Sequence, residues 1–152
     1  MEFRDAWSIA CKDLRIELRS RILTNQIAPY TLLIVVLFGF ALDADTQTLR
    51  DTGPGLFWVA VLLIALLAIQ RAVKIEDDDA ARERMLLTPV HSSSVFFGKA
   101  IALFIQLFAL EVLLFFVMLA LFDLSVEDPL LICLSAILAT IGVASSGTLY
   151  GV

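Results

Sequence analysis

The sequence predicts an all-α, polytopic membrane protein, and three observations lead to this prediction. The chain of 152 residues is 60% hydrophobic and has a mean hydropathy of +0.91, whereas soluble domains are roughly half apolar. Its apolar residues gather in four stretches that approach the ~20 residues a helix needs to cross a bilayer core of ~30 Å. Lysine and arginine concentrate in alternate connections between these stretches. Together these features favour a helical membrane domain over a soluble one.

We expect four spanning helices, at residues 22–42, 55–73, 96–122 and 130–152. A helix is expected because lipid offers no partners to backbone N–H and C=O groups, and a helix satisfies its own. Pro29 falls near the start of the first span, where a missing N–H costs least. The second span has a short apolar stretch and requires Arg71 to reach toward water. Residues 1–152 read as one membrane domain, and because the fourth span is still apolar at Val152, an N-terminal fragment is expected.

The positive charges predict an orientation, because cytoplasmic connections retain an excess of lysine and arginine. Those before the first span are Arg4, Lys12, Arg15, Arg19 and Arg21. Those between the second and third spans are Arg71, Lys74, Arg82, Arg84 and Lys99. Of the other two connections, one holds Arg50 alone and one holds neither residue type. The N-terminus and the loop at 74–95 are therefore expected in the cytoplasm.

The segment before the first span, residues 1–21, predicts an amphipathic helix in the membrane surface, called the elbow helix here. At ~100° per residue one stripe is apolar: Phe3, Ala6, Trp7, Ala10, Cys11, Leu14 and Leu18. One flank is basic: Arg4, Lys12, Arg15 and Arg19. The candidate functional residues of the helix are Trp7, Lys12, Asp13, Arg15, Glu17 and Arg19. A soluble helix packed on a partner protein is the alternative, since amphipathicity does not separate lipid from protein contact.

Several chemistries are excluded by the residues present. The pair Gly98-Lys99 is followed by Ala100, where a phosphate-binding loop needs serine or threonine. The single histidine is His91, and no second ligand stands at a metal-binding spacing. The two cysteines form no covalent haem motif, and a net charge of -5 disfavours nucleic-acid binding. No catalytic, cofactor or metal site is predicted, and the chain is expected not to be an enzyme.

Glu111 is the ionisable residue well inside a predicted span. A charge at the bilayer centre costs at least ~2.5 to 3.5 kcal/mol. Glu111 is therefore either a protonatable or substrate-facing group, or a neutral acid that bonds a neighbouring helix. In the fourth span Gly142 and Ser146, and also Gly147 and Gly151, stand four residues apart. Such small residues predict close helix packing.

The loop at 74–95 carries acids first and arginines later, which suits a short helix ended by a proline. Such a helix would expose an apolar patch shaped to dock on a soluble partner. The alternative is that the patch folds back on the membrane surface. The candidate coupling residues are Glu76, Asp79, Glu83, Met85, Leu86, Leu87 and Pro89.

Several stretches resemble the CcmB family of cytochrome c maturation proteins, which form the membrane subunit of the haem-exporter ABC transporter. They are KDLRIELRSR at 12–21, VLFGFAL at 36–42, PGLFWV at 54–59, MLLTPV at 85–90 and GK at 98–99. The resemblance extends over all 152 residues. It implies a fold similar to type-2 ABC exporters, with an elbow helix, six spans and a coupling helix between spans two and three. Four of those six spans would be present here.

The resemblance also implies a function. The chain would be a non-enzymatic permease subunit of the cell inner membrane that receives ATP-driven motion from a separate ABC ATPase subunit. Its task would be haem delivery for c-type cytochromes, by releasing a haem-loaded periplasmic chaperone from haem-handling membrane subunits. It would bind no cofactor directly; haem would be the cargo, and ATP would act through the partner subunit.

Two other functions remain open from the sequence. A type-2 ABC permease that exports lipid or polysaccharide would share the elbow and coupling helices and differ in its substrate. A proton-linked secondary transporter would use Glu111 and would need no ATPase partner. Changing Glu111 to glutamine separates these, since unchanged cytochrome c assembly would exclude a proton-coupled role.

Overall fold

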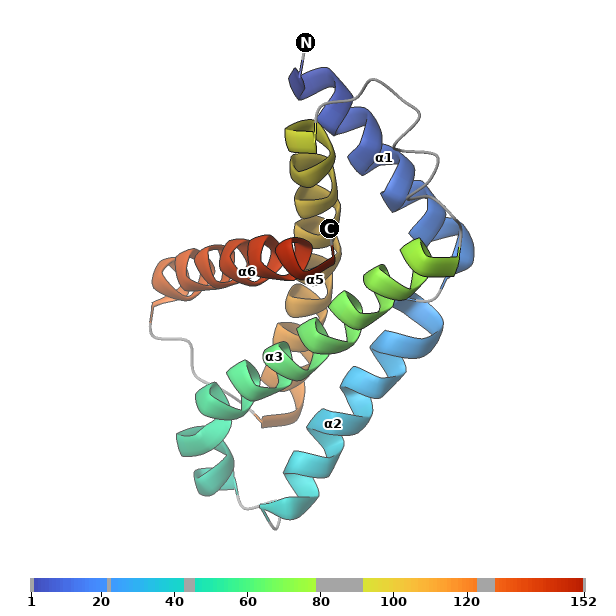
Figure 1. Cartoon of the computed structure of the whole chain (residues 1–152). Helices are drawn as coiled ribbons and strands as arrows, with labels where there is room; N and C mark the ends of the chain where they lie inside the picture. Colours follow the sequence, from blue (N-terminus) through green and yellow to red (C-terminus); the bar gives the residue numbers. More distant parts are fainter. Residues whose placement is uncertain (1, 22, 43–45, 79–91, 123–127, 152) are drawn as a thin grey trace.

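A computed structural model describes residues 2–21, 23–42, 46–78, 92–122 and 128–151 (Figure 1). The regular structure in these ranges is helical, as the sequence predicts. In chain order the elements are α1 (Glu2–Ser20), the π-helical segment η1 (Leu23–Ile27), α2 (Ala28–Ala41), α3 (Thr46–Asp78), α5 (Ser92–Phe122) and α6 (Pro129–Gly151). The predicted all-α class is confirmed.

Three of the described helices are long and apolar enough to cross a membrane, within Gln47–Val73, Ser93–Phe122 and Pro129–Tyr150. The first predicted span, 22–42, is instead a shorter apolar helix over Asn25–Ala41. It begins as η1, which continues directly into α2, and Pro29 stands in the first turn of α2. The 5 residues of η1 and 14 of α2 extend about 28 Å at about 1.5 Å per residue. This segment is therefore the shortest of the four.

The second predicted span begins later than the helix itself. We expected residue 55, but α3 begins at Thr46 and contains Pro54. The polar composition of 46–54 indicated a connection, yet a proline inside a helix removes a single backbone donor, and membrane helices tolerate this. Near this point the Thr52 hydroxyl donates to the carbonyl of Thr48 (2.6 Å). The first part of α3 is thus a helical extension of the apolar span.

Helix α5 is the centre of the fold. Figure 1 shows α1 lying against its first part, α2 and α3 running alongside one another, and α6 crossing α5 at a steep angle. One face of α5 is buried at helical spacing, at Leu103, Leu107, Leu110, Leu114 and Met118. It packs in one core with buried residues of α3, namely Phe57, Ala60, Ile64, Ala65 and Ala68. This central helix therefore positions the helices on either side of it.

Most of each long helix faces outward and is apolar. In the most apolar windows of α3, α5 and α6, only 28%, 39% and 22% of residues are buried. Exposed side chains on these helices include Leu66, Phe116 and Leu138. Soluble proteins rarely expose apolar patches of this extent. The outward faces therefore require lipid or further apolar helices around them.

Helix α6 approaches its neighbours closely at Gly147. A Cβ atom there would lie 2.6 Å from both Cδ1 and Cγ1 of Ile69, and 3.3 Å from Cδ2 of Leu103. Gly142 has open space around it and Ser146 is exposed, so these two lie on an unpacked face. Gly151 is the last residue of α6.

We expect Gly147→Ala to lower the free energy of unfolding by about 1–3 kcal/mol, because the added methyl group overpacks this contact. The control is Gly142→Ala on the same helix, where the methyl group meets nothing within 4 Å and helix propensity predicts a gain of up to about 1 kcal/mol. Denaturant titration of the purified protein in mixed micelles measures both. Equal effects of the two substitutions would contradict the packing at Gly147.

Candidate functional site

The elbow helix α1 docks on α5 through small residues. Ala6 and Ala10 are 4% and 0% exposed, and Gly98 of α5 lies opposite them. A Cβ atom on Gly98 would lie 2.8 Å from the carbonyl oxygen of Ala6 and 2.8 Å from Cβ of Ile9. Small residues at a crossing let two helix backbones approach closely. Helix α1 is therefore a fixed part of the bundle.

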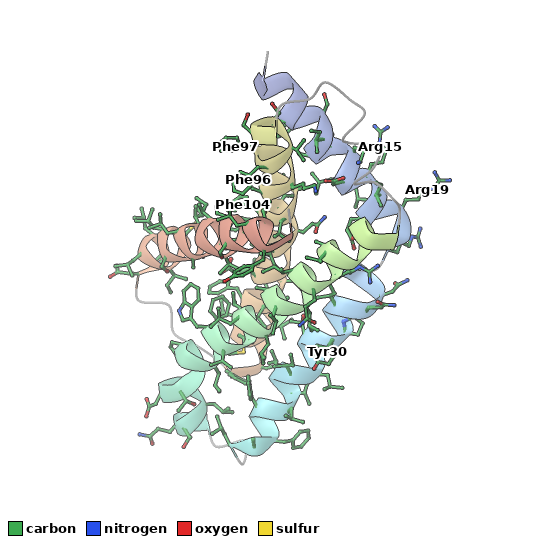
Figure 2. The ribbon with its side chains drawn as sticks, in the orientation of Figure 1. Arg15, Arg19, Tyr30, Phe96, Phe97 and Phe104 are labelled. Atoms are coloured by element: carbon green, nitrogen blue, oxygen red, sulfur yellow. The ribbon has the colours of Figure 1, made fainter. Side chains whose placement is uncertain are left out.

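The other faces of α1 remain open to its surroundings. Trp7 is 52% exposed and Leu18 is 79% exposed, and both lie beside the docked face. Arg15 and Arg19 project away from α5 (Figure 2). An apolar strip flanked by arginines suits a helix at a membrane surface with anionic headgroups. The helix packs on α5 within its own chain and presents an amphipathic outer surface, and contact of that surface with the membrane stays a prediction.

A partly open cavity of about 110 Å³ lies where α1, α3, α5 and α6 meet. Its charged lining comes from three helices, at Asp13, Glu17, Arg71 and Lys99, and Gln106 and Thr148 are also polar. Its apolar lining includes Ile16, Ile27, Ile69 and Leu103. The sequence indicated these charges singly, and only the tertiary packing brings them together.

On one side of this cavity, the Arg71 side chain is hydrogen-bonded to a residue of η1. It donates from Nη1 to Oε1 of Gln26 (3.2 Å). Its Nε is buried, and no acceptor for it lies among the described residues. On the α1 side of the cavity, Asp13 forms an ion pair of 3.4 Å with Lys12. A buried donor without a partner is costly, so this end of the Arg71 side chain is an energetically unfavourable point of the packing.

Glu111 is 5% exposed and joins α5 to α6. The hydroxyl oxygen of Thr140 lies 2.5 Å from Oε2 of Glu111 and 2.7 Å from the carbonyl oxygen of Ala136. A hydroxyl has one proton to donate, so it cannot donate to both oxygens. If it donates to Ala136, the carboxyl group must donate to Thr140 in its neutral form. That arrangement avoids an uncompensated charge inside a span.

Oε1 of Glu111 lies buried with no hydrogen-bond partner among the described residues. Glu111 lines a second cavity of about 20 Å³ between α3, α5 and α6. That volume is about what one water needs. The sequence identified Glu111 but missed Thr140, although an acid in a span needs a polar partner, and hydroxyl side chains of another span are the natural candidates.

We expect Thr140→Val to lower the free energy of unfolding by about 0.6–1.7 kcal/mol, the range for interhelical hydrogen bonds in membranes. Glu111→Gln should retain most of the stability, because its amide can donate to Thr140. The matched control is Thr148→Val, whose buried hydroxyl on the same helix is hydrogen-bonded to the carbonyl of Ala144 in its own helix. Denaturant titration in micelles measures all three. Equal losses for the two threonines would argue against a link through Glu111.

The candidate coupling residues lie mostly beyond what the structure describes. Asp79, Glu83, Met85, Leu86, Leu87 and Pro89 fall within 79–91, outside the described residues, and so does His91. Glu76 stands in the last turns of α3, and its side chain is not described. Within the described part of the chain, no group of three or more histidine, cysteine, aspartate or glutamate residues could hold a metal ion.

The long apolar helices and the outward apolar faces define a multi-pass helical membrane protein. A family model described as CcmB protein matches residues 4–152. The chain therefore belongs to the CcmB family, and the resemblance seen in the sequence is confirmed.

Curated relatives agree with this assignment. The chain is 29% identical over 96 residues to "Heme exporter protein B" of Escherichia coli K12, covering 63% of this chain and 44% of that protein. It is 32% identical over 88 residues to the protein of the same name from Pseudomonas aeruginosa, covering 51% of this chain and 40% of the relative. The match thus spans less than half the length of these relatives. No solved structure matches the chain.

Proposed function

We propose that this chain is part of the membrane permease subunit of an ABC transporter that delivers haem for c-type cytochrome biogenesis. In this proposal a separate ATPase subunit hydrolyses ATP, and the permease converts the resulting motion into release of a haem-loaded chaperone. The observation that carries the proposal is the family match over residues 4–152, together with the relatives named "Heme exporter protein B". The permease would lie in the cell inner membrane with its N-terminus in the cytoplasm.

The helix arrangement supports a mechanical role for the coupling loop. α3 ends at Asp78 and α5 begins at Ser92, so the residues between them connect two helices that pack in one core. Motion imposed on this loop by a docked ATPase would act directly on both helices. α5 also contacts α1 and α6, so a displacement of α5 would reach every long helix of the fold. The ATPase subunit and the helices of the permease would thus be coupled through α5.

The structure favours a packing role for Glu111 over proton transport. The carboxyl group is buried and bonded to Thr140, and the adjoining cavity measures about 20 Å³. A carrier of protons needs a route to water on each side, and this cavity has room for about one water. In our proposal ATP drives the transporter, and Glu111 helps to hold α5 and α6 together.

The proposal is tested with the full-length protein in a strain that lacks the native gene. We expect the tagged protein to restore haem-stained c-type cytochromes and to co-purify with the candidate ATPase subunit. A strain whose ATPase lacks its phosphate-binding lysine is the control, and it should keep the complex but lose the cytochromes. If the protein co-purifies with the ATPase subunit but deletion of the native gene leaves c-type cytochromes unchanged, the permease carries another cargo. Failure to retain any ATPase would refute the ABC assignment.

A further inference from the structure

We propose that the partly open cavity of about 110 Å³ between α1, α3, α5 and α6 is a water-filled inlet into the membrane layer. Water would pass the charged residues at the ends of the spans and reach Gln106 of α5 and Thr148 of α6. This inference is independent of the proposed function, because it uses only the cavity, its lining and the length of an apolar stretch.

Gln106 is the polar residue of the lining that stands farthest along α5. It lies about two helical turns, or roughly 10 Å, beyond Lys99. The side chain is partly exposed, and its amide makes no hydrogen bond within the described part of the chain. An amide can make about four hydrogen bonds, and an amide left without any in apolar surroundings is costly. Water at Gln106 would remove this cost.

Thr148 lines the same cavity from α6. Its hydroxyl already donates to the carbonyl of Ala144 in its own helix (2.7 Å). A hydroxyl oxygen also has acceptor lone pairs, so Thr148 can still accept a hydrogen bond from water. One water needs about 10–15 Å³ of such space, and a cavity of about 110 Å³ therefore has room for several waters.

The apolar stretch of α3 is an independent reason to expect water at this depth. Residues 56–69 extend about 21 Å at about 1.5 Å per residue, whereas a bilayer core measures ~30 Å. Arg71 stands shortly after this stretch and lines the cavity. Charged residues inside a span almost always face the bundle interior or a water-filled cavity. The inlet would supply this water to Arg71, whose hydrogen bond to Gln26 is exposed.

The charged residues of the lining need not be unpaired for water to bind them. Asp13 forms an ion pair with Lys12 and is still 28% exposed, and a carboxylate can accept about four hydrogen bonds. Glu17 and Lys99 also have interaction partners, and paired charges keep further positions for water. A lipid chain in the cavity would leave these positions without partners, which is costly. The charged part of the lining therefore favours water over a lipid chain.

The inlet ends before Glu111. None of the residues that line it also lines the cavity of about 20 Å³ beside Glu111. Leu103 belongs to the first cavity, and Leu107, one turn further along α5, belongs to the second. Water in the inlet would thus stop short of Glu111, in agreement with the packing role proposed for that residue.

The first test is radiolytic footprinting of the wild-type, full-length protein in lipid nanodiscs. X-rays produce hydroxyl radicals from water, and mass spectrometry locates the oxidised side chains. Ile69 lines the cavity and is partly buried, whereas Leu66, one turn earlier on α3, is 54% exposed on the outward face. We expect Ile69 to be oxidised several-fold faster than Leu66, because the radicals react close to the water that forms them. Oxidation of Leu66 as fast as that of Ile69 would overturn the proposal.

The second test compares two single cysteines on α5 in a full-length protein whose native cysteines, including Cys11 and Cys133, are replaced by serine. Gln106→Cys places a thiol in the inlet, and Ala109→Cys places one on an exposed, outward position less than one turn away. We expect iodoacetate, a small charged reagent, to label Gln106→Cys at least about tenfold faster, because the reactive thiolate is suppressed in apolar surroundings. Equal rates would overturn the proposal. Labelling of Gln106→Cys only by a lipid-soluble maleimide would also overturn it, since a lipid chain would then fill the cavity.

Discussion

Replacing Gly98 with leucine is expected to separate α1 from α5. Even a Cβ atom at this position would lie 2.8 Å from the carbonyl oxygen of Ala6 and 2.9 Å from Cγ2 of Ile9. Because one of these atoms belongs to the backbone, no side-chain rotation relieves the clash. Gly98→Ala should therefore lower the free energy of unfolding by about 1–3 kcal/mol. Leucine adds a branched side chain at the same crossing, and the two helices must then move apart.

The consequence is measured by trypsin cleavage within α1, at Lys12, Arg15 and Arg19, in protein reconstituted in nanodiscs. We expect Gly98→Leu to accelerate cleavage at least about tenfold, because undocking removes the packing that keeps the segment helical. Gly55→Leu is the matched control, since an added Cβ at Gly55 of α3 meets nothing within 4 Å. Equal cleavage rates in the two variants would show that α1 does not depend on this contact.

The elbow helix shows which features the sequence could predict and which depend on packing. Amphipathic spacing predicted a helix over residues 1–21, and α1 covers Glu2–Ser20. Ala6 and Trp7 were assigned to the same apolar stripe. In the structure Ala6 is buried against α5 while Trp7 is half exposed. Hydrophobicity places both residues on the same face of the helix. Only the small size of alanine and of Gly98 decides which part of that face packs on α5.

The long apolar helices could be located in the sequence because lipid imposes a length on apolar helices. The third and fourth spans were expected at 96–122 and 130–152, and α5 and α6 cover Ser92–Phe122 and Pro129–Gly151. The first part of α3 was not predicted, since the mostly polar residues 46–54 are helical where hydropathy indicates a loop. A helix that extends beyond the apolar layer leaves no hydropathy signal.

The Glu111–Thr140 pair and the cavity beside Arg71 also depend partly on sequence and partly on packing. Glu111 could be identified from the sequence, because an acid inside an apolar run is energetically exceptional. Its partner Thr140 could not, because several hydroxyl residues of α6 were equivalent until the crossing of the two helices placed one of them opposite. The cavity beside Arg71 was harder still to predict from the sequence. Its charges belong to three helices, and each one alone resembles an ordinary residue at the end of a span.

Changing Glu83, Met85 and Leu86 together to alanine is expected to abolish binding of the ATPase subunit and, with it, formation of c-type cytochromes. In the proposed function these residues of the 74–95 loop supply the apolar and acidic contacts of a docked motor. Removing the central contacts of an interface typically costs about 2 kcal/mol or more, which corresponds to a loss of affinity of roughly thirtyfold or more. The amount of protein in the membrane should stay the same, because these substitutions leave the spans unchanged.

A matched control exists near the start of α6. Asp128, Leu130 and Leu131 have the same spacing and nearly the same chemistry as the loop triplet, and all three are exposed at the start of α6. Changing them to alanine should preserve both the complex and the cytochromes, since the positive charges predict that this connection faces away from the cytoplasm. Co-purification and haem staining of the full-length variants measure the outcome. If the variant with the loop substitutions retains the ATPase subunit as well as the variant with the α6 substitutions does, the ATPase subunit docks elsewhere. If only the variant with the α6 substitutions loses the ATPase subunit, the predicted orientation is inverted.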